Sequence, residues 1–316
     1  MEQLSDLKAI LHSKRANIYY LEMCRVMQKD GRILYLSETS KEYQYWNIPI
    51  ANTTCLLLGT GTSITQPAMR MLAQAGVLVG FTGGGGTPLL MANEIEWLTP
   101  QSEYRPTEYI QGWLGFWFDD TRRLETAKRF QVARIRFIQK VWAKDRELNI
   151  EGFNVDDLQN EFDKTFKNIE NAYCINKLLQ LEADLTKKLY KYAAQKTGQL
   201  GFIREHAKAE DANGFLDHGN YLAYGLGATT LWVLGIPHGF AVMHGKTRRG
   251  ALVFDVADLI KDALILPWAF ICAKEKQSEK EFRSQCLQTF VEHKALDFMF
   301  DEVKKASLFY NNEQKS

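Results

Sequence analysis

Hydrophobic and polar residues follow two different periods along this chain. In the first third, segments 18–27 and 32–36 are rich in β-branched and aromatic residues, which favours strands. Asp30-Gly31 lies between them and is typical of a two-residue hairpin turn. We therefore expect two antiparallel strands joined by a tight turn.

A β-α-β unit is expected next. The apolar run 55–58 predicts a strand, and the apolar-rich stretch 68–75, which Gly76 ends, predicts a helix. Residues 77–81 predict a second strand. The glycines at 83–86 suit neither a strand nor a helix interior, so we expect the unit to close there.

Beyond residue 106 the apolar residues recur with the 3.6-residue period of helices. The expected helices cover residues 107–146, 155–171, 173–197, 217–234, 255–273 and 277–306. The pattern therefore predicts an α+β protein with two domains, a small β-rich N-terminal domain and a larger all-α C-terminal domain. The expected bounds are 1–86 for the first domain, 87–106 for a linker, 107–310 for the second domain and 311–316 for a disordered polar tail.

The composition argues against a membrane protein, a secreted disulfide-rich protein and a cysteine zinc protein. Of the 316 residues, 46% are hydrophobic, which allows a substantial core, yet no apolar run is long enough to span a bilayer. Residues 1–14 mix charged and apolar side chains, unlike a signal peptide. Five cysteines without a C-x-x-C pair argue against a disulfide framework and a cysteine zinc site. We therefore expect a cytoplasmic protein without membrane contact.

The helix expected over 173–197 carries a carboxylate within its apolar stripe. Glu182 shares about 80° of arc with the apolar residues Ile175, Leu178, Leu185 and Leu189. A buried carboxylate needs a cation, hydrogen-bond donors or a raised pKa. The alternatives are a buried ion pair with a lysine or arginine elsewhere in the chain, or a helix rolled so that the carboxylate reaches water.

A second group of candidate ligands lies further along the chain. Asp255 and Asp258 are three residues apart, near one face of a helix start, among apolar neighbours. Two enclosed carboxylates raise each other's pKa unless a cation intervenes, and carboxylate oxygens suit Mg²⁺ or Mn²⁺. His244, in a glycine-bounded loop, offers a nitrogen ligand. Alternatively, Asp255 is an N-cap, Asp258 interacts with the helix dipole, and His244 is structural.

Basic residues are concentrated at two places, although the formal net charge is only +1. If residues 121–146 form one helix, a stripe about 80° wide holds Arg122, Arg129, Arg136, Lys140 and Lys144. Three more follow His244 directly, namely Lys246, Arg248 and Arg249. A metal site beside positive charge suits a phosphodiester substrate, so these residues are candidates for DNA binding. The alternative for the stripe is a solvated helix face.

These motifs resemble those of the CRISPR-associated protein one family, the integrase of spacer acquisition, and are most similar to its subtype I-F. Leu181-Glu182-Ala183 lies early in a helix of the helical domain, where the family has its metal glutamate. The stretch from His244 through Lys261 contains His-Gly-Lys and Phe-Asp-Val-Ala-Asp-Leu-Ile-Lys, like the family's histidine and acidic pair. The glycine-dotted helix around 220–225 is also similar.

The resemblance implies a magnesium- or manganese-dependent DNA endonuclease and integrase. Glu182, His244 and Asp258 would bind the metal, with Asp255 beside them as a supporting catalytic residue or occasional ligand. The 3′-hydroxyl of a captured DNA fragment would attack a phosphodiester of the CRISPR repeat. The implied partners are DNA, a second copy of the chain joined through the N-terminal domains, and the CRISPR-associated protein two, which this subtype carries fused to a helicase–nuclease.

Three other functions are compatible with the residues. A structure-selective metal-dependent nuclease would cut DNA without joining it. A metal hydrolase for small phosphorylated molecules would have a closed pocket without a basic approach surface. A DNA-holding scaffold would use its acidic residues only as helix caps and ion pairs, and would lose no metal site on Glu182→Ala.

Overall fold

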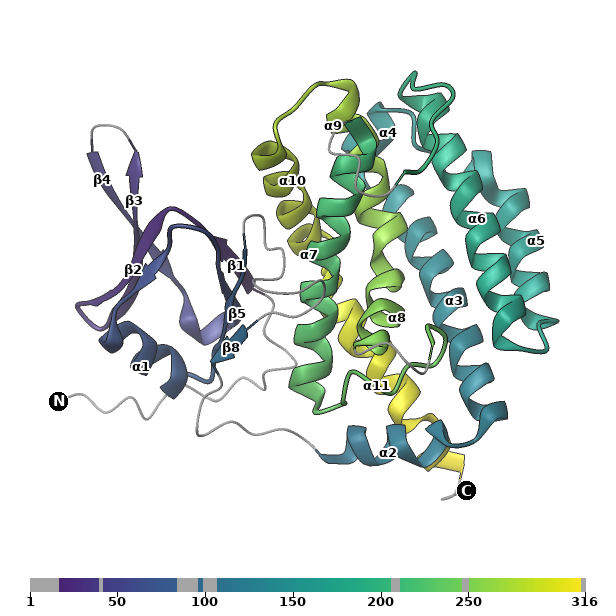
Figure 1. Cartoon of the computed structure of the whole chain (residues 1–316), viewed down its shortest axis with the longest axis horizontal. Coiled ribbons are helices and arrows are strands. Elements are labelled where there is room, and N and C mark those ends of the chain that lie inside the picture. The colour runs from purple at the N-terminus through teal and green to yellow at the C-terminus, as the bar shows by residue number, and fades with distance from the viewer. Residues whose placement is uncertain are drawn as a thin grey trace. The chain divides into compact units, whose positions relative to one another are not determined.

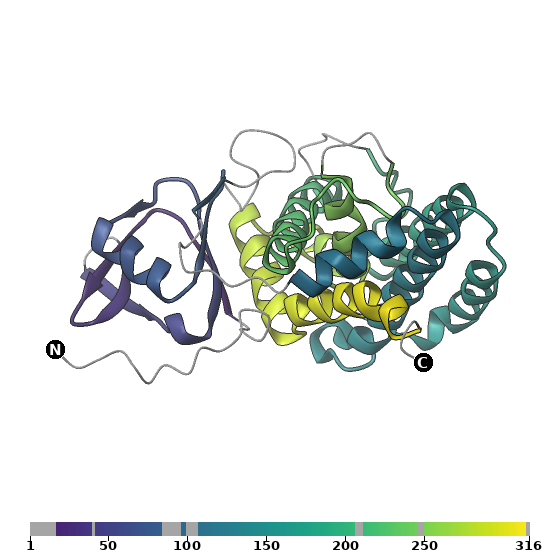
Figure 2. The same ribbon diagram turned by 90° about the horizontal axis from the view of Figure 1, so that it is seen from below.

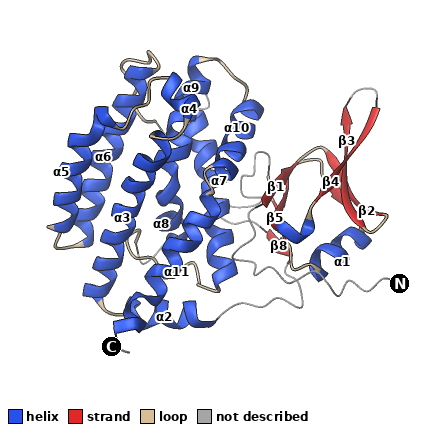
Figure 3. Ribbon diagram, turned by 180° about the vertical axis from the view of Figure 1, so that it is seen from behind, coloured by secondary structure: helices blue, strands red, loops and turns tan. Residues whose placement is uncertain are grey.

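The computed structural model describes residues 17–39, 42–83, 96–98, 107–205, 211–245 and 250–313. They group into two compact units, Met1–Pro106 and Thr107–Ser316. The first unit holds all the described strands, and the second is helical (Figures 1 and 3). The expected α+β fold class, with a β-rich N-terminal part and a larger helical part, is confirmed.

Two four-stranded sheets form the N-terminal unit. The first has the order β1-β5-β7-β8, with bounds Asn17–Leu21, Thr53–Leu58, Leu78–Phe81 and Glu96–Leu98. The second has the order β4-β3-β2-β6, with bounds Glu42–Ile48, Arg32–Thr39, Cys24–Lys29 and Ser63–Ile64. A single apolar core takes residues from both sheets and from helix α1 (Gln66–Gln74), among them Val26, Leu56 and Leu72.

The expected hairpin is confirmed, but the strand expected over 18–27 is two strands. Lys29 pairs with Arg32, and the positive φ of both Asp30 (49°) and Gly31 (72°) is the geometry that a two-residue hairpin favours. At Met23 the chain leaves the first sheet for the second, with φ 49° and the backbone N–H donating to the Thr60 carbonyl at 2.9 Å. The break between the two strands could not be predicted, because the apolar pattern continues through it.

The β-α-β unit is confirmed as β5, α1 and β7, with the two strands parallel. Its helix ends before Gly76, which has φ 69°. Strands β4 and β6 had no sequence prediction. Strand β8 pairs with β7 although it lies within residues 87–106, which were expected to form a linker. Part of that segment therefore belongs to the sheet.

The helical unit contains ten described α-helices. They are α2 Thr107–Trp117, α3 Asp120–Trp142, α4 Arg146–Ile150, α5 Gln159–Glu170, α6 Ile175–Lys196, α7 Asp211–Leu234, α8 Ala251–Ile260, α9 Leu266–Lys274, α10 Glu279–Glu292 and α11 Ala295–Glu313. Helices α2 and α11 lie side by side (Figure 2). Within the described ranges, no helix has the length and apolar character needed to cross a membrane.

Several expected helices are interrupted where a side chain caps a new one. The segment expected over 107–146 breaks at Asp119, whose carboxylate accepts from the backbone N–H groups of Thr121 at 2.9 Å and Arg122 at 3.1 Å and so starts α3. The segment expected over 277–306 breaks at Lys294, which has φ 52°. The helix expected from residue 217 begins at Asp211.

Helix α8 begins at Ala251 and not at Asp255, because Gly250 caps it in the left-handed conformation with φ 78°. Asp255 is therefore inside the helix and is not its N-cap. A π-helical segment, Lys261–Ile265, follows α8 and leads into α9. Such segments are rare and are often found at functional sites.

Helix α7 packs closely against α8, which carries both aspartates. A Cβ atom at Gly227 would lie 3.0 Å from the Val253 carbonyl oxygen and 3.5 Å from the Ala257 nitrogen. Both neighbours are backbone atoms, which move only if the helix moves. The absence of a side chain at residue 227 therefore sets the position of α8.

We expect Gly227→Ala to destabilise the protein by about 1–2 kcal/mol, because overpacking outweighs the helix propensity gained. Gly115 is the matched control, since it is also helical and a Cβ there would meet nothing within 4 Å. Gly115→Ala should leave stability unchanged or raise it by up to about 1 kcal/mol. Urea unfolding measures both, and equal stability for the two variants would contradict this packing argument.

Candidate metal centre

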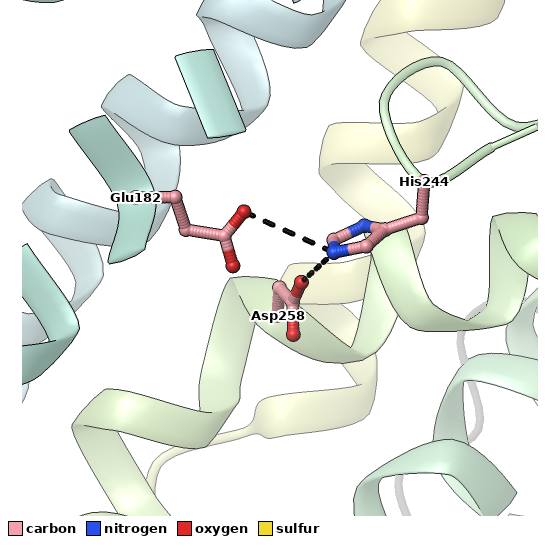
Figure 4. A group of neighbouring side chains, drawn as sticks. All are labelled: Glu182, His244 and Asp258. Atoms are coloured by element: carbon pink, nitrogen blue, oxygen red, sulfur yellow. Dashed lines mark ion pairs between the residues drawn. The ribbon is translucent and has the colours of Figure 1, made fainter. Parts of the chain in front are cut away.

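Three elements bring the predicted ligands together. Glu182 comes from α6, His244 from the loop after α7, and Asp258 from α8 (Figure 4). One ligand atom of each lies within 4.8 Å of the other two. The Nε2 atom of His244 is 3.9 Å from Glu182 Oε2 and 3.6 Å from Asp258 Oδ2. The convergence expected from the sequence is therefore present.

The spacing and the donor set fit a divalent cation. Ligand atoms about 2.0–2.6 Å from a central ion are themselves separated by roughly 3–5 Å, as these atoms are. Two carboxylates and one imidazole suit Mg²⁺ or Mn²⁺. The exposed fractions of the side chains are 28% for His244, 16% for Glu182 and 4% for Asp258. The site is therefore most accessible beside the histidine ring.

Asp255 holds the histidine loop in place. Its buried carboxylate accepts hydrogen bonds from the backbone N–H groups of Val242 at 2.7 Å, Met243 at 3.1 Å and His244 at 3.0 Å. Its Oδ1 atom is also 2.7 Å from His244 Nδ1. When the ring is neutral, a proton on Nδ1 leaves the Nε2 lone pair directed at Glu182 and Asp258. Asp255 thus orients the ligand and its loop.

Arg134 on α3 belongs to the same cluster, although the sequence analysis did not select it. Its buried guanidinium lies 3.5 Å from Glu182 and donates through Nε to Asp262 at 2.6 Å. It also donates to Thr186 at 2.6 Å. The alternative of an ion pair between Glu182 and a distant arginine is therefore also present in the structure. The ion pair and the candidate metal site therefore share this carboxylate.

Lys261, in the π-helical segment, is the second cation of the cluster. It forms an ion pair with Asp258, and its Nζ atom lies 5.3 Å from the centroid of the Tyr224 ring. Asp258, Lys261 and Asp262 have the i, i+3, i+4 spacing that places side chains on one helix face. That spacing was the available signal for Lys261. Nothing comparable was available for Arg134, whose acidic partners Glu182 and Asp262 are 48 and 128 residues away.

The charges within this cluster do not balance. Among the described residues in contact there, the carboxylates are Glu182, Asp255, Asp258 and Asp262, and the fixed cations are Arg134 and Lys261. Four negative charges and two positive charges leave two negative charges when His244 is neutral. A divalent cation would supply the missing charge, since like charges at such distances repel strongly in a buried site.

The pKa values reflect this imbalance. Burial and the Asp258 charge raise the pKa of Glu182 to about 7, although Arg134 acts in the opposite direction. Burial alone would lower the pKa of His244, but the hydrogen bond with Asp255 and the charge of Asp258 outweigh it and raise this pKa to about 9. Burial alone would raise the pKa of Asp258, yet Lys261 and His244 lower it. A metal ion that binds here would therefore displace protons from Glu182 and His244.

The basic residues of α3 that were predicted to contact DNA do not lie at this site. Those on α3 are Arg122, Arg129, Arg136 and Lys140, of which Arg122 is half-buried and the others are exposed. The helix ends at Trp142, so the expected stripe does not continue to Lys144. At about 100° per residue, the three exposed residues lie roughly 120–160° around α3 from Arg134. Outside the described residues lie Lys246, Arg248 and Arg249.

The sequence matches known proteins over most of its length. The family model for CRISPR associated protein Cas1 matches residues 18–304. The CRISPR-associated endonuclease Cas1 of Pseudomonas aeruginosa is 58% identical over 308 residues, which cover 95% of each chain. The CRISPR-associated endonuclease Cas1 of Pectobacterium atrosepticum is 54% identical over 309 residues, covering 95% of this chain and 94% of that one.

Solved structures share the fold at low identity. A casposase bound to integration product has a TM-score of 0.68 at 12% identity, covering 95% of this chain and 92% of that one. A TtCas1–DNA complex has a TM-score of 0.60 at 21% identity, covering 92% and 90%. A Cas6-RT-Cas1–Cas2 complex has a TM-score of 0.60 at 14% identity, covering 96% of this chain and 36% of that longer one.

We expect Asp255→Asn to lower the free energy of unfolding by about 2–4 kcal/mol, because an amide cannot replace a buried carboxylate that accepts several N–H groups. The pKa of His244 should also fall. Urea unfolding and an NMR titration of the histidine measure the two effects. Asp301→Asn, an exposed aspartate on α11, is the control and should change stability by no more than about 0.5 kcal/mol. Wild-type stability and histidine pKa in Asp255→Asn would refute the role assigned to this carboxylate.

We expect the affinity for Mn²⁺ to rise with pH, since binding displaces protons held with pKa values of about 7 at Glu182 and about 9 at His244. The logarithm of the affinity should rise with a slope near 2 per pH unit below about pH 7 and near 1 above it. Calorimetry in buffers of different ionisation enthalpy counts the released protons. An affinity that is constant from about pH 6 to 8.5 would contradict this expectation.

Proposed function

Because the chain belongs to the family of CRISPR-associated Cas1 proteins, we propose that it is a metal-dependent DNA endonuclease and integrase that inserts captured DNA fragments into a CRISPR array. The observation that carries this proposal is the convergence of Glu182, His244 and Asp258. The two relatives above 50% identity are both named endonucleases, which supports nuclease chemistry. The casposase bound to integration product supports strand transfer on this fold.

Glu182, His244 and Asp258 would hold Mg²⁺ or Mn²⁺, and Asp255 would support His244 from behind. The ion would stabilise negative charge on the reacting phosphate and help to activate the attacking or leaving oxygen. The protein's own contribution is orientation and charge. Asp255 directs Nε2 of His244 toward the ligand carboxylates, while Arg134 and Lys261 favour the ionised forms of those carboxylates.

The proposed reaction exchanges one phosphodiester for another. The 3′-hydroxyl of the captured fragment attacks a phosphorus atom of the repeat, a new phosphorus–oxygen bond forms, and the bond to the leaving 3′-oxygen breaks. The attacking hydroxyl loses its proton, and the leaving oxygen gains one. If water attacks in place of the hydroxyl, the same site hydrolyses the strand. No change of oxidation state is required.

The proposed partners follow from the family. DNA is the substrate, and the TtCas1–DNA complex supports it. A second copy of the chain would bind through the N-terminal units. The CRISPR-associated protein two, fused to a helicase–nuclease, would complete the assembly, and the Cas1–Cas2 complex of a fold relative supports this association.

We expect Glu182→Gln, His244→Ala and Asp258→Asn each to reduce strand transfer at least about 100-fold while changing DNA affinity less than about threefold. Phosphate contacts supply most of the DNA affinity, whereas the ligands act on charge that develops during the reaction. The triple variant should be hardly worse than each single variant, because ligands of one ion act as a unit. The assay joins a labelled fragment to repeat DNA in the presence of the partner protein, beside filter binding and thermal melts.

Asp184→Asn is the control, since Asp184 is exposed on the same helix as Glu182. It should retain wild-type activity. Full joining activity in a folded Glu182→Gln variant would overturn the mechanism. An equal loss of DNA affinity and joining in all three variants would favour a DNA-holding scaffold instead.

A further inference from the structure

A groove lies between α3 and α11, and the proposed chemistry does not use it. Its cavity has a volume of about 460 Å³, within the range typical of ligand sites. The residues that matter for its chemistry are Arg129, Arg136, Phe137 and Lys140 of α3 and Phe298 and Lys305 of α11. This groove also contains most of the basic stripe that the sequence pattern placed on α3.

The floor of the α3–α11 groove is aromatic. The rings of Phe137 and Phe298 stack with their centroids 4.0 Å apart and their planes at 6°. Phe298 is half-buried, so part of its ring remains exposed beside the buried Phe137. Ala133 and Ala306 also line the cavity, and their small side chains leave space beside the two aromatic rings. A flat or branched apolar side chain could bury its surface here.

The rim of the groove is positively charged. Four lining residues are cations and one, Glu302, is an acid, so the lining carries a net charge of +3. Glu302 pairs with Lys305 at 2.6 Å. No ion pair joins Arg136 or Lys140 to an acidic side chain of the part of the chain that is described. These two exposed cations are therefore available to an anionic partner.

The groove is distinct from the metal centre. Arg134 points from α3 toward Glu182, whereas the cations of the rim point roughly 120–160° around the same helix. The guanidinium of Arg129 is held over the Phe309 ring at 3.2 Å from its centroid, so this part of the rim is fixed by α11.

We propose that the α3–α11 groove binds an acidic peptide segment of a partner protein, anchored by an aromatic or aliphatic side chain on the exposed part of Phe298, which stacks on the buried Phe137. Carboxylates beside the anchor match the cations of the rim, and aromatic and arginine side chains are enriched at such interfaces. A DNA backbone has no apolar group to place on an aromatic floor. Duplex DNA would also meet a cavity where it needs an open track of cations.

The test uses the full-length chain and a labelled hexapeptide, Glu-Asp-Trp-Leu-Asp-Glu, in fluorescence anisotropy. We expect Arg136→Glu and Lys140→Glu each to weaken binding at least tenfold, because each replaces an attractive charge with a repulsive one. Both residues are exposed, so the fold should tolerate these changes. Lys191→Glu, an exposed lysine of α6, makes the same change of charge elsewhere and should retain wild-type binding.

Two altered peptides test the apolar anchor and the negative charge of the peptide separately. A peptide with serine in place of tryptophan and leucine, and one with amides in place of the carboxylates, should both bind at least tenfold more weakly. Binding that is equal for wild type and Arg136→Glu would overturn the proposal. Displacement of the peptide by a duplex of about two helical turns, with DNA affinity reduced in both α3 variants, would assign the groove to DNA and equally overturn it.

Discussion

The packing of four carboxylates, three buried and one half-buried, where α3, α6 and α8 meet is the constraint on which the rest of this structure depends. Arg134 and Lys261 offset half of their charge, and both cations are themselves enclosed in the cluster. An unpaired buried charge costs several kcal/mol, so each of these side chains must keep its partners. The cluster therefore joins the helices electrostatically as well as by apolar packing, and a divalent ion would offset its remaining negative charge.

Backbone contacts position the candidate ligand residues within this cluster. Asp255 holds three consecutive N–H groups of the histidine loop, so a loop without regular structure becomes as well positioned as a helix. Gly227 allows α7 to approach the backbone of α8, and the π-helical segment after α8 places Lys261 and Asp262 toward their partners. Helices and buried hydrogen bonds position the three candidate ligands. We therefore expect their geometry to change little when substrate binds.

The sequence predicted the convergence of Glu182, His244 and Asp258 better than the residues that surround them, for physical reasons. A carboxylate in an apolar stripe is visible in a local pattern, and so is an acidic pair three residues apart. Arg134 is not, because its contacts with Glu182 and Asp262 depend on tertiary packing. The same limit explains the strand break at Met23 and the helix breaks at Asp119 and Lys294, since single backbone angles and caps interrupt patterns that remain apolar throughout. Asp255 was open to two interpretations for this reason, and only the start of α8 at Ala251 decides between them.

Helix α3 shows how one amphipathic element can serve two electrostatic functions. Its buried face contributes a cation that offsets acidic ligands, while its outer face contributes cations with no acidic partner in the described structure. A net charge of +1 for the whole chain is compatible with both, because the acidic excess of the cluster and the cations of the groove lie on different faces of α3. Salt should act differently on the two faces. At about 0.1 M salt, attraction between exposed charges more than about 10 Å apart is largely screened, whereas charges in the buried cluster are screened much less. Binding at the groove is therefore expected to depend strongly on ionic strength, and the geometry of the metal centre is not.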